Sequence, residues 1–402
     1  MHTKVFCVFE GGGAKGVAHV GALRAIENVV EYEVKGFAGT SAGAIVAALA
    51  AVGWSSHELV TQHDDGRIES QALQAIGHGG ATSLAALFGD EWKKLRRLGG
   101  KDSSDGLGAG WLKNTRAKWL TILLFLAFWP MFYHVGRWLT AEWIGLAGLL
   151  VELVASVAWL GYFILWAWIF VTLRRLWTCF RGVADMEPII QVLDKLLKAK
   201  IAPQGDRVTF LDVREKSGQH LKIVAANIHT GAMTLFDSAG TPNVAVADAV
   251  AASACIPVAF SPVEIEGQQF CDGGIVSNLP AWTFDDERLL DEDSLVITCE
   301  LLDGCTDDIE RDEVRALAGA QMVLRMARTA AFGGAALNTR GLQNHIRIPM
   351  EPDVGILEFD TTEKHLKAVD DAEKVAQLRI DSYRFEQESL AEIYDAVLDY
   401  LC

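Results

Sequence analysis

A serine stands between two glycines in the segment Gly39-Thr40-Ser41-Ala42-Gly43, which fits the pattern G-x-S-x-G. An apolar run precedes this segment and an alanine-rich run follows it, so we expect the serine between a strand and a helix. Glycines on either side permit a sharp turn that exposes the hydroxyl as a nucleophile and leaves the N–H of Ala42 free to stabilise an oxyanion. Chains rich in Gly and Ala also contain this pattern by chance, and a purely structural turn is the alternative.

A glycine-rich turn with the sequence GGGAKG, from Gly11 to Gly16, lies upstream of the serine. Glycines there let successive backbone N–H groups point into one cavity at the start of a helix, where a phosphate or an oxyanion is stabilised. The turn also satisfies G-x-G-x-x-G, with Glu31 and Glu33 near the distance of a ribose-binding acid, so a site for NAD or FAD is an alternative. A P-loop is excluded because Lys15 is followed by Gly16 and Val17 rather than by Ser or Thr.

An aspartate followed by two glycines, Asp272-Gly273-Gly274, comes late in the chain. Such a segment is most often a turn. A carboxylate that serves as general base must come within hydrogen-bond reach of the serine hydroxyl, and neighbouring glycines would permit that approach. A triad would instead need one of the ten histidines beside Ser41. Because His19 falls one turn into an expected helix and the others have no recognisable context, Asp272 is the preferred base.

Alternating strands and helices are expected to position these motifs. Residues 4–9 and 34–38 are short apolar runs typical of strands, and helical patterns follow them at 17–30 and through 51. Further strands are expected at 208–213, 221–226, 233–236 and 295–299, with helices at 244–254 and 363–400. This alternation predicts an α/β fold with a mostly parallel sheet covered on both faces.

The ordered combination of the three motifs resembles the patatin-like phospholipase family: GGGxKG, then GTSAG about 25 residues later, then a late DGG. The segment Ala252–Pro257, followed by Phe260 and Pro262, also resembles that family's stretch before DGG. The resemblance covers roughly residues 4–55 and 205–285. It implies a patatin-like three-layer fold and an acyl hydrolase that uses a Ser–Asp dyad.

Carried over to this chain, the resemblance makes Ser41 the nucleophile and Asp272 the general base. The oxyanion hole would consist of the backbone N–H groups of Gly11, Gly12 and Gly13, together with that of Ala42. Lys15 occupies the position of a basic residue in the family and would orient this loop. The other glycines of the motifs would support the site: Gly16, Gly39, Gly43, Gly273 and Gly274.

The amino-acid composition argues against several classes of binding partner and bound group. The chain of 402 residues has 52 acidic and 36 basic side chains and a formal net charge of −16, which argues against nucleic acid. Its seven cysteines are scattered, without a CxxC pair or a Cys/His cluster. Neither a disulfide framework nor a zinc site is indicated, and we expect no metal or cofactor.

A strongly apolar block occupies residues 119–173. Nine of the twelve tryptophans lie between 111 and 177, and residues 153–173 form a run of 21 without a charge, long enough to cross a bilayer. Residues 119–136 would make a shorter span with Pro130 inside it. Basic residues flank the block on both sides, which places both ends on the cytoplasmic face. The alternative is a pair of buried core helices.

These patterns predict an order of parts along the chain. Residues 1–90 would carry the oxyanion loop and the nucleophile, 91–118 a basic linker, 119–173 a transmembrane hairpin, and 182–402 the catalytic aspartate and C-terminal helices.

The expected function is a membrane-anchored serine acyl hydrolase of the phospholipase A or lipid esterase type, acting on a bilayer phospholipid or another acyl lipid. A non-catalytic membrane scaffold with this fold and an NAD- or FAD-dependent oxidoreductase are the alternatives. Nothing in the sequence indicates an oligomeric state.

Overall fold

The computed structural model describes residues 2–62, 68–77, 154, 161–162, 164–172, 182, 184–257, 259–302, 338–339, 342–355, 358–359 and 362–401. The chain divides into two compact units, one made of residues 1–92 and 184–402 and the other of residues 93–183. The candidate site lies in the first unit, whose described residues form the fold that follows.

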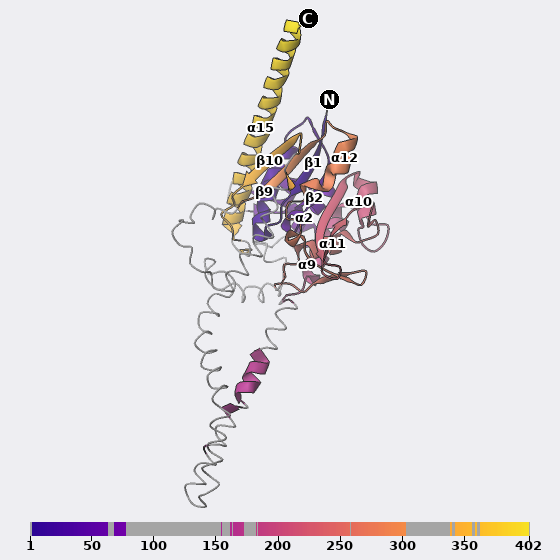
Figure 1. The fold of residues 1–402 in the computed structure, drawn as a ribbon. Coiled ribbons are helices and arrows are strands. Elements are labelled where there is room, and N and C mark those ends of the chain that lie inside the picture. The colour runs from indigo at the N-terminus through magenta and orange to yellow at the C-terminus, as the bar shows by residue number, and fades with distance from the viewer. Residues whose placement is uncertain are drawn as a thin grey trace, which may run out of the picture. The chain divides into compact units, whose positions relative to one another are not determined.

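A mostly parallel sheet forms the centre of this unit (Figure 1). Five strands pair in parallel in the order β10 (His345–Met350), β9 (Leu295–Leu301), β1 (Thr3–Phe9), β2 (Tyr32–Gly39) and β5 (His220–Asn227). Three antiparallel strands extend the sheet beyond β5: β6 (Ala232–Phe236), β7 (Val263–Ile265) and β8 (Gln268–Asp272). The expected parallel α/β sheet is confirmed, while β7, β8 and β10 add strands that the sequence patterns do not predict.

Both faces of the sheet are covered. Phe6 and Phe9 of β1 point to opposite faces because side chains alternate along a strand. The ring of Phe6 stacks on Phe284, with centroids 4.6 Å apart, in the short helix Ala281–Phe284. Phe9 packs against His19 of α1 (Ala18–Glu27), with centroids 5.2 Å apart. The strand is therefore buried on both sides, as its continuous apolar sequence predicts.

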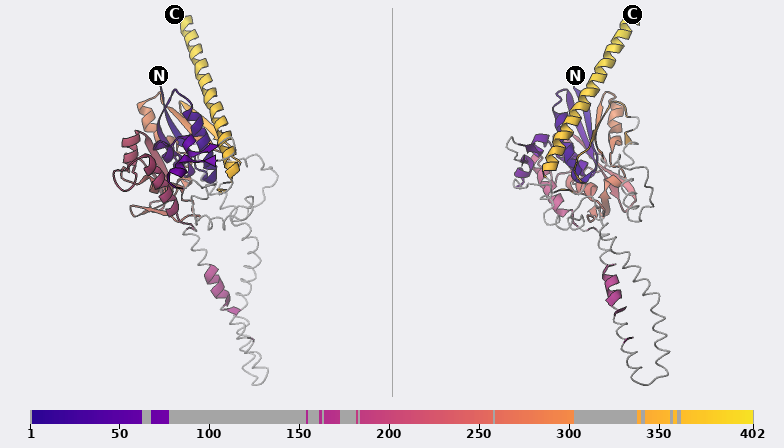
Figure 2. Two further views of the ribbon diagram at one scale, coloured as in Figure 1. Left: turned by 180° about the vertical axis from the view of Figure 1, so that it is seen from behind. Right: turned by 90° about the vertical axis from the view of Figure 1, so that its left-hand side faces the viewer.

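The remaining helices surround the sheet and the site. They are α2 (Ala42–Ala51), α3 (Ser56–Leu59), α4 (Gln71–Ala75), α9 (Glu187–Lys200), α10 (Phe210–Ser217), α11 (Val246–Ala254), α12 (Asp285–Leu290) and α15 (Thr362–Leu401). The first half of α15 packs closely on α1, since a Cβ on Gly21 would lie 2.0 Å from the carbonyl oxygen of Val369. Figure 2 shows α15 continuing as one long helix past the sheet.

One expected strand is a helix. Residues 208–213 have the β-branched and aromatic composition of a strand, but α10 begins at Phe210. Thr209 caps this helix: its hydroxyl accepts from the N–H of Asp212 at 3.2 Å, and the Asp212 carboxylate accepts from the N–H of Thr209 at 3.0 Å. This reciprocal capping box satisfies two backbone donors and outweighs the strand propensity of the segment.

The prediction of an integral membrane protein is wrong. Among the residues that the structure describes, no helix is both long enough and apolar enough to cross a bilayer. The long helix α15 carries charged residues throughout, and the longest described part of the predicted hairpin is residues 164–172, about half of the ~20 residues that a span needs. Apart from this stretch and residues 154 and 161–162, the predicted hairpin at 119–173 lies outside the described residues, as does the linker at 91–118.

Candidate active site

Ser41 occupies the turn between β2 and α2, as its motif predicts. Its backbone has φ 53° and ψ −122°, a conformation that costs a residue with a side chain about 1–3 kcal/mol. Close packing accounts for the flanking glycines. A Cβ on Gly39 would lie 2.4 Å from the backbone of Gly43, and a Cβ on Gly43 would lie 2.2 Å from the carbonyl oxygen of Phe9. The surrounding backbone therefore holds the strained turn in place.

The Ser41 hydroxyl donates a hydrogen bond of 2.7 Å to Oδ2 of Asp272. The other carboxylate oxygen of Asp272 accepts from the backbone N–H of Gly274 at 2.7 Å, which fixes the orientation of the carboxylate. Both side chains are buried. Burial raises the pKa of Asp272 to about 6, although the bonds from Ser41 and Gly274 favour its charged form. A carboxylate placed in this way can accept the serine proton near neutral pH.

Three backbone amides of the glycine turn and of the start of α2 are free in the described part of the chain. Within the described residues, the N–H groups of Gly12, Gly13 and Ala42 have no hydrogen-bond acceptor. Gly11 differs from the expectation, because its N–H donates to the carbonyl oxygen of Asn278 at 3.1 Å. The glycine turn and the start of α2 can therefore offer amides to an oxyanion, but the amide of Gly11 has a structural partner.

The glycine turn is held by groups that the sequence patterns did not identify. The Asn278 side-chain amide donates to the carbonyl oxygen of Gly11 and to Oε1 of Glu10, both at 3.0 Å. The second carboxylate oxygen of Glu10 accepts from the N–H of Leu301 at 2.6 Å, and His19 Nε2 contacts the carbonyl oxygen of Glu10 at 2.8 Å. The sequence did contain one signal for these contacts: Glu10 comes directly after an apolar strand and before the glycine-rich turn. The structure buries this carboxylate, and a buried carboxylate needs specific hydrogen-bond donors.

A second serine supports the turn that carries Ser41. Ser253 of α11 is fully buried, and its hydroxyl accepts from the N–H of Ser41 at 2.9 Å. The same hydroxyl donates to the carbonyl oxygen of Val224 in β5 at 2.6 Å. Thr40 adds a link to the aspartate loop by donating to the carbonyl oxygen of Ser277 at 2.9 Å. Ser253 lies in the segment Ala252–Pro257, which the family resemblance singles out without giving this serine a role.

The other expected supporting residues lie around the same pair. Lys15 is buried within the short helix Gly13–Val17 that follows the glycine turn. A Cβ on Gly16 would lie 2.4 Å from that of Ala42, so the turn lies directly against the start of α2. A Cβ on Gly273 would lie 2.1 Å from the carbonyl oxygen of Val224, and one on Gly274 would lie 2.9 Å from Oδ1 of Asp272. These glycines permit the close approach of Asp272 to Ser41.

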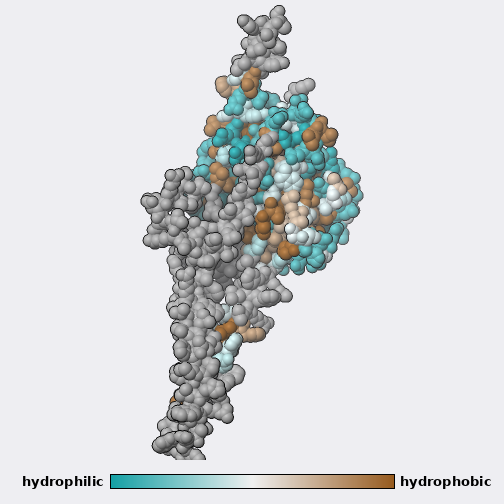
Figure 3. Space-filling view, in the orientation of Figure 1, coloured by the Kyte–Doolittle hydropathy of each residue, from teal (hydrophilic) through white to brown (hydrophobic). Residues whose placement is uncertain are grey.

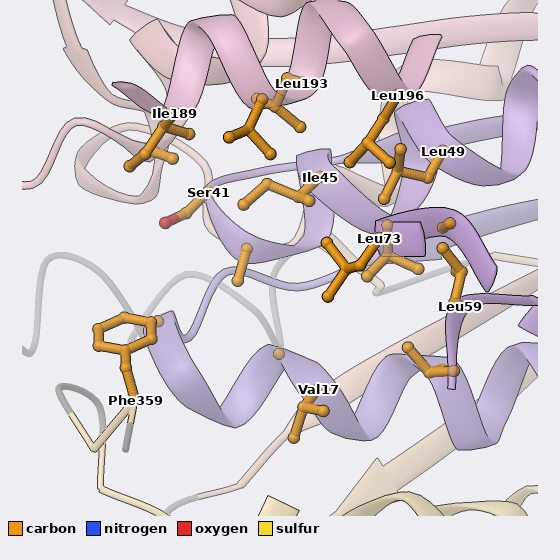
Figure 4. Close-up of a pocket in the computed structure, with 18 of the residues that line it drawn as sticks. Val17, Ser41, Ile45, Leu49, Leu59, Leu73, Ile189, Leu193, Leu196 and Phe359 are labelled. Carbon is orange, nitrogen blue, oxygen red and sulfur yellow. The ribbon is translucent and has the colours of Figure 1, made fainter. Parts of the chain in front are cut away.

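An apolar cavity of about 210 Å³ opens beside Ser41 (Figure 4). Its walls come from α2, α9, the start of α1, and the α3–α4 segment. In contrast, the visible surface of the described unit is largely hydrophilic (Figure 3). The cavity therefore offers an apolar ligand a place next to the serine hydroxyl. Its lining includes Gly13, Val17, Ser41, Ile45, Leu49, Leu59, Leu73, Ile189, Leu193, Leu196 and Phe359.

Comparison with protein families decides the classification of this fold and site. The model of the patatin-like phospholipase family matches residues 7–285, a range that contains both Ser41 and Asp272. The chain belongs to the patatin-like phospholipase family. This membership confirms the resemblance of the three motifs, and it favours a lipid ester hydrolase over the dinucleotide-dependent alternative for the Gly11–Gly16 turn.

Individual relatives match shorter parts of the chain. A probable lipid hydrolase of Invertebrate iridescent virus 6, 463L, is 28% identical over 25% of this chain and 33% of its own length. The uncharacterized protein YqhO of Bacillus subtilis is 50% identical over 13% of this chain and 18% of its own length. The matched regions thus span a third or less of these two relatives.

Solved structures also resemble the chain. VipD from Legionella pneumophila has a TM-score of 0.42 at 18% identity, covering 95% of this chain and 67% of that one. The type III effector protein ExoU, from Pseudomonas aeruginosa, has a TM-score of 0.36 at 15% identity, covering 95% of this chain and 53% of that one.

Histidines and metal ligands do not join the pair in the described part of this patatin-like chain. No described histidine hydrogen-bonds to Ser41 or Asp272, and burial lowers the pKa of His19 to about 4, so its ring is neutral at physiological pH. No group of three or more His, Cys, Asp or Glu side chains there could hold a metal ion.

Proposed function

We propose that this protein is a serine acyl hydrolase that cleaves lipid esters, with Ser41 as the nucleophile and Asp272 as the general base. The observation that carries the proposal is the 2.7 Å hydrogen bond from the Ser41 hydroxyl to Asp272, beside free backbone amides and an apolar cavity. Family membership supports the same chemistry. Residues 1–90 and 182–402 would form the catalytic core, which agrees in extent with the first compact unit.

In the first step, the Asp272 carboxylate accepts the hydroxyl proton while Ser41 Oγ attacks the carbonyl carbon of the ester. The negative charge moves to the carbonyl oxygen. The N–H groups of Gly12, Gly13 and Ala42, which have no acceptor among the described residues, would stabilise this charge. Because Ala42 is the first residue of α2, the helix dipole adds to this stabilisation.

The tetrahedral intermediate then collapses. The carbonyl re-forms, the bond to the leaving alcohol breaks, and protonated Asp272 returns its proton to the alkoxide. Ser41 is left acylated. Water enters, Asp272 takes one of its protons, and the resulting hydroxide attacks the acyl carbon. This second tetrahedral intermediate collapses, the bond from the acyl carbon to Ser41 Oγ breaks, and Asp272 returns its proton to Oγ, which releases a free carboxylic acid and restores the enzyme.

The apolar cavity supports a lipid as the acyl donor, either a membrane phospholipid or another acyl lipid. A fatty-acyl chain in this cavity would exchange water for aliphatic side chains, while its ester carbonyl stays beside Ser41. Among the described residues that line the cavity, no side chain carries a charge that could pair with a charged substrate. This arrangement favours an acyl ester over a charged, water-soluble substrate.

Hydrolysis assays test the proposal directly. Release of fatty acid from phosphatidylcholine in mixed micelles, and hydrolysis of a p-nitrophenyl ester, would be measured for wild type, Ser41→Ala and Asp272→Asn. We expect loss of about 10³-fold or more in each variant, because each removes a group that acts in every turnover. Ser294→Ala is a matched control, since this buried serine donates to the carbonyl oxygen of Asp291 at 2.7 Å and bonds to neither Ser41 nor Asp272. Hydrolysis by Ser41→Ala at the wild-type rate would overturn the proposal.

A further inference from the structure

The apolar cavity runs along one helix. Ser41, Ile45 and Leu49 all line it, at four-residue spacing from the start of α2 towards its end. Residues four apart lie on the same face of a helix. Figure 4 shows Ser41 at one end of this row, Ile45 in the middle and Leu49 at the other end. The cavity therefore extends from the serine in one direction, over about 12 Å between Ser41 and Leu49 at a rise of about 1.5 Å per residue.

The opposite wall follows the same direction. Ile189, Leu193 and Leu196 of α9 line the cavity at helical spacing, and Figure 4 places them in that order alongside Ser41, Ile45 and Leu49. This wall is fixed at its far end, because the indole N–H of Trp54 donates to the carbonyl oxygen of Leu196 at 3.0 Å. Trp54 comes three residues after the end of α2, so this bond joins the segment that follows α2 to α9.

Leucines line the far end of the cavity. Leu49, Leu59 and Leu196 come from three different helices, and all three side chains are buried. Ser70 is the one polar side chain in the described lining besides Ser41, and its hydroxyl accepts from the N–H of Leu73 at 3.2 Å. The channel is thus apolar and directional, with the Ser41 hydroxyl at one end and aliphatic side chains at the other.

We propose that this channel selects the length of the acyl chain, favouring one unbranched acyl group of about ten carbons, with Leu49 and Leu59 as the residues that set the limit. The proposal rests on the proposed function, because the acyl carbonyl must lie at Ser41. An extended aliphatic chain advances about 1.25 Å per carbon, given C–C bonds of about 1.5 Å and angles near 111°. A channel of about 12 Å therefore accommodates about ten carbons between the carbonyl and Leu49.

Each added methylene should strengthen binding until the chain reaches the leucines. Transfer of one methylene from water to an apolar site changes an equilibrium about fourfold. For wild type, kcat/KM should therefore rise about fourfold per carbon up to about ten carbons, and then stop rising or fall. A channel that did not end at Leu49 would give a rise that continues through longer chains.

A series of p-nitrophenyl esters from acetate to palmitate, used as dispersed monomers, tests the assignment. Leu49→Phe extends a side chain into the far end and should move the kcat/KM maximum about two carbons shorter, whereas Leu49→Ala opens the end and should move it about two carbons longer. Leu59→Ala should act in the same direction as Leu49→Ala. Each profile is scaled to the same variant's rate with acetate, which cancels differences in the amount of folded enzyme.

Leu197→Ala is the matched control. Leu197 follows Leu196 in α9 and is fully buried, but it does not line the cavity. Its truncation should lower stability as Leu49→Ala does and leave the chain-length maximum where wild type has it. Opposite shifts in Leu49→Phe and Leu49→Ala with no shift in Leu197→Ala would support the proposal.

The ester series distinguishes failure of the chain-length assignment from failure of the proposed function. Wild type and variants that hydrolyse the esters with the same chain-length maximum would overturn the role of Leu49 and Leu59 and leave the proposed function standing. Wild type that hydrolyses none of the esters, acetate included, would overturn the proposed function and the inference together.

Discussion

Asn278 and Gly11 are joined by two hydrogen bonds. The N–H of Gly11 donates to the Asn278 carbonyl oxygen at 3.1 Å, and the Asn278 side-chain amide donates back to the Gly11 carbonyl oxygen at 3.0 Å. Asn278 follows the Asp272 loop, whereas Gly11 begins the glycine turn. The two bonds therefore hold the candidate base and the candidate oxyanion amides in one rigid arrangement, as preorganised electrostatic stabilisation requires.

Replacing Asn278 should lower the rate of the chemical step. Asn278→Asp removes the amide that bonds to Gly11 and places a carboxylate against Glu10, so like charges would displace the turn. We expect kcat to fall about 10²-fold, with a smaller change in KM. Asn227→Ala is the control, because Asn227 is buried at the end of β5 and bonds to residues of the β5–β6 turn. Equal kcat in Asn278→Asp and wild type would contradict the positioning role.

Ser253 is expected to affect both activity and stability. In Ser253→Ala the N–H of Ser41 and the carbonyl oxygen of Val224 lose their partner inside the protein, which destabilises the fold by about 1–3 kcal/mol. Because the strained turn at Ser41 loses its anchor, kcat should fall as well. Urea denaturation and steady-state kinetics would be compared with Ser294→Ala, which should lose stability alone. A Ser253→Ala enzyme with wild-type kcat would show that the turn holds its shape without this bond.

The pH dependence should report Asp272. Burial raises the pKa of this carboxyl to about 6, and only its ionised form can accept the serine proton. Below this pKa, kcat/KM should fall about tenfold per pH unit, and it should level off above pH 7. A rate profile of a soluble ester between pH 4.5 and 8 measures this. An acidic limb centred near 4, the range of an ordinary carboxyl, would contradict the effect of burial on Asp272.

The same pKa makes a prediction about stability. Asp272 ionises less readily in the folded protein than at its ordinary pKa of 3.8, so keeping it charged opposes folding at neutral pH. The stability that the protonated form provides is complete below about pH 4 and is lost as pH rises through about 6. Asp272→Asn should therefore be inactive and yet more stable than wild type at pH 7.5, by at most about 3 kcal/mol, because the amide keeps an acceptor for only one of the two donors, Ser41 and Gly274. The gain should shrink between pH 6 and pH 4, and a variant less stable than wild type at pH 7.5 would refute this reasoning.

Local sequence patterns predicted the elements that carry the candidate site. Short apolar runs before the Gly11 turn and before Ser41 correspond to β1 and β2, and both motifs lie between a strand and a helix as expected. Glycine positions were informative because several of them, among them Gly39, Gly43 and Gly273, have no room for a side chain. Motif spacing alone, however, could not bring Asp272 to Ser41, which are 231 residues apart.

The remaining features depend on contacts between distant segments. Nothing near Asn278 in the sequence indicates that its side chain binds Glu10 and Gly11, and the Ser253–Ser41 bond likewise joins α11 to a distant turn. Residues 208–213 were misassigned because a strand-like composition concealed a capping box. The expected membrane span rested on length and apolarity, and no described helix has both.

The most direct test of the account is covalent labelling of the serine. Purified wild type would be treated with a fluorophosphonate, digested and examined by mass spectrometry, alongside Ser41→Ala, Asp272→Asn and Ser294→Ala. We expect one adduct on the peptide that contains Ser41, strongly reduced labelling in Asp272→Asn, none at this peptide in Ser41→Ala, and wild-type labelling in Ser294→Ala. An adduct on a different serine, or Ser41 labelling that proceeds at the wild-type rate in Asp272→Asn, would contradict a nucleophile activated by Asp272.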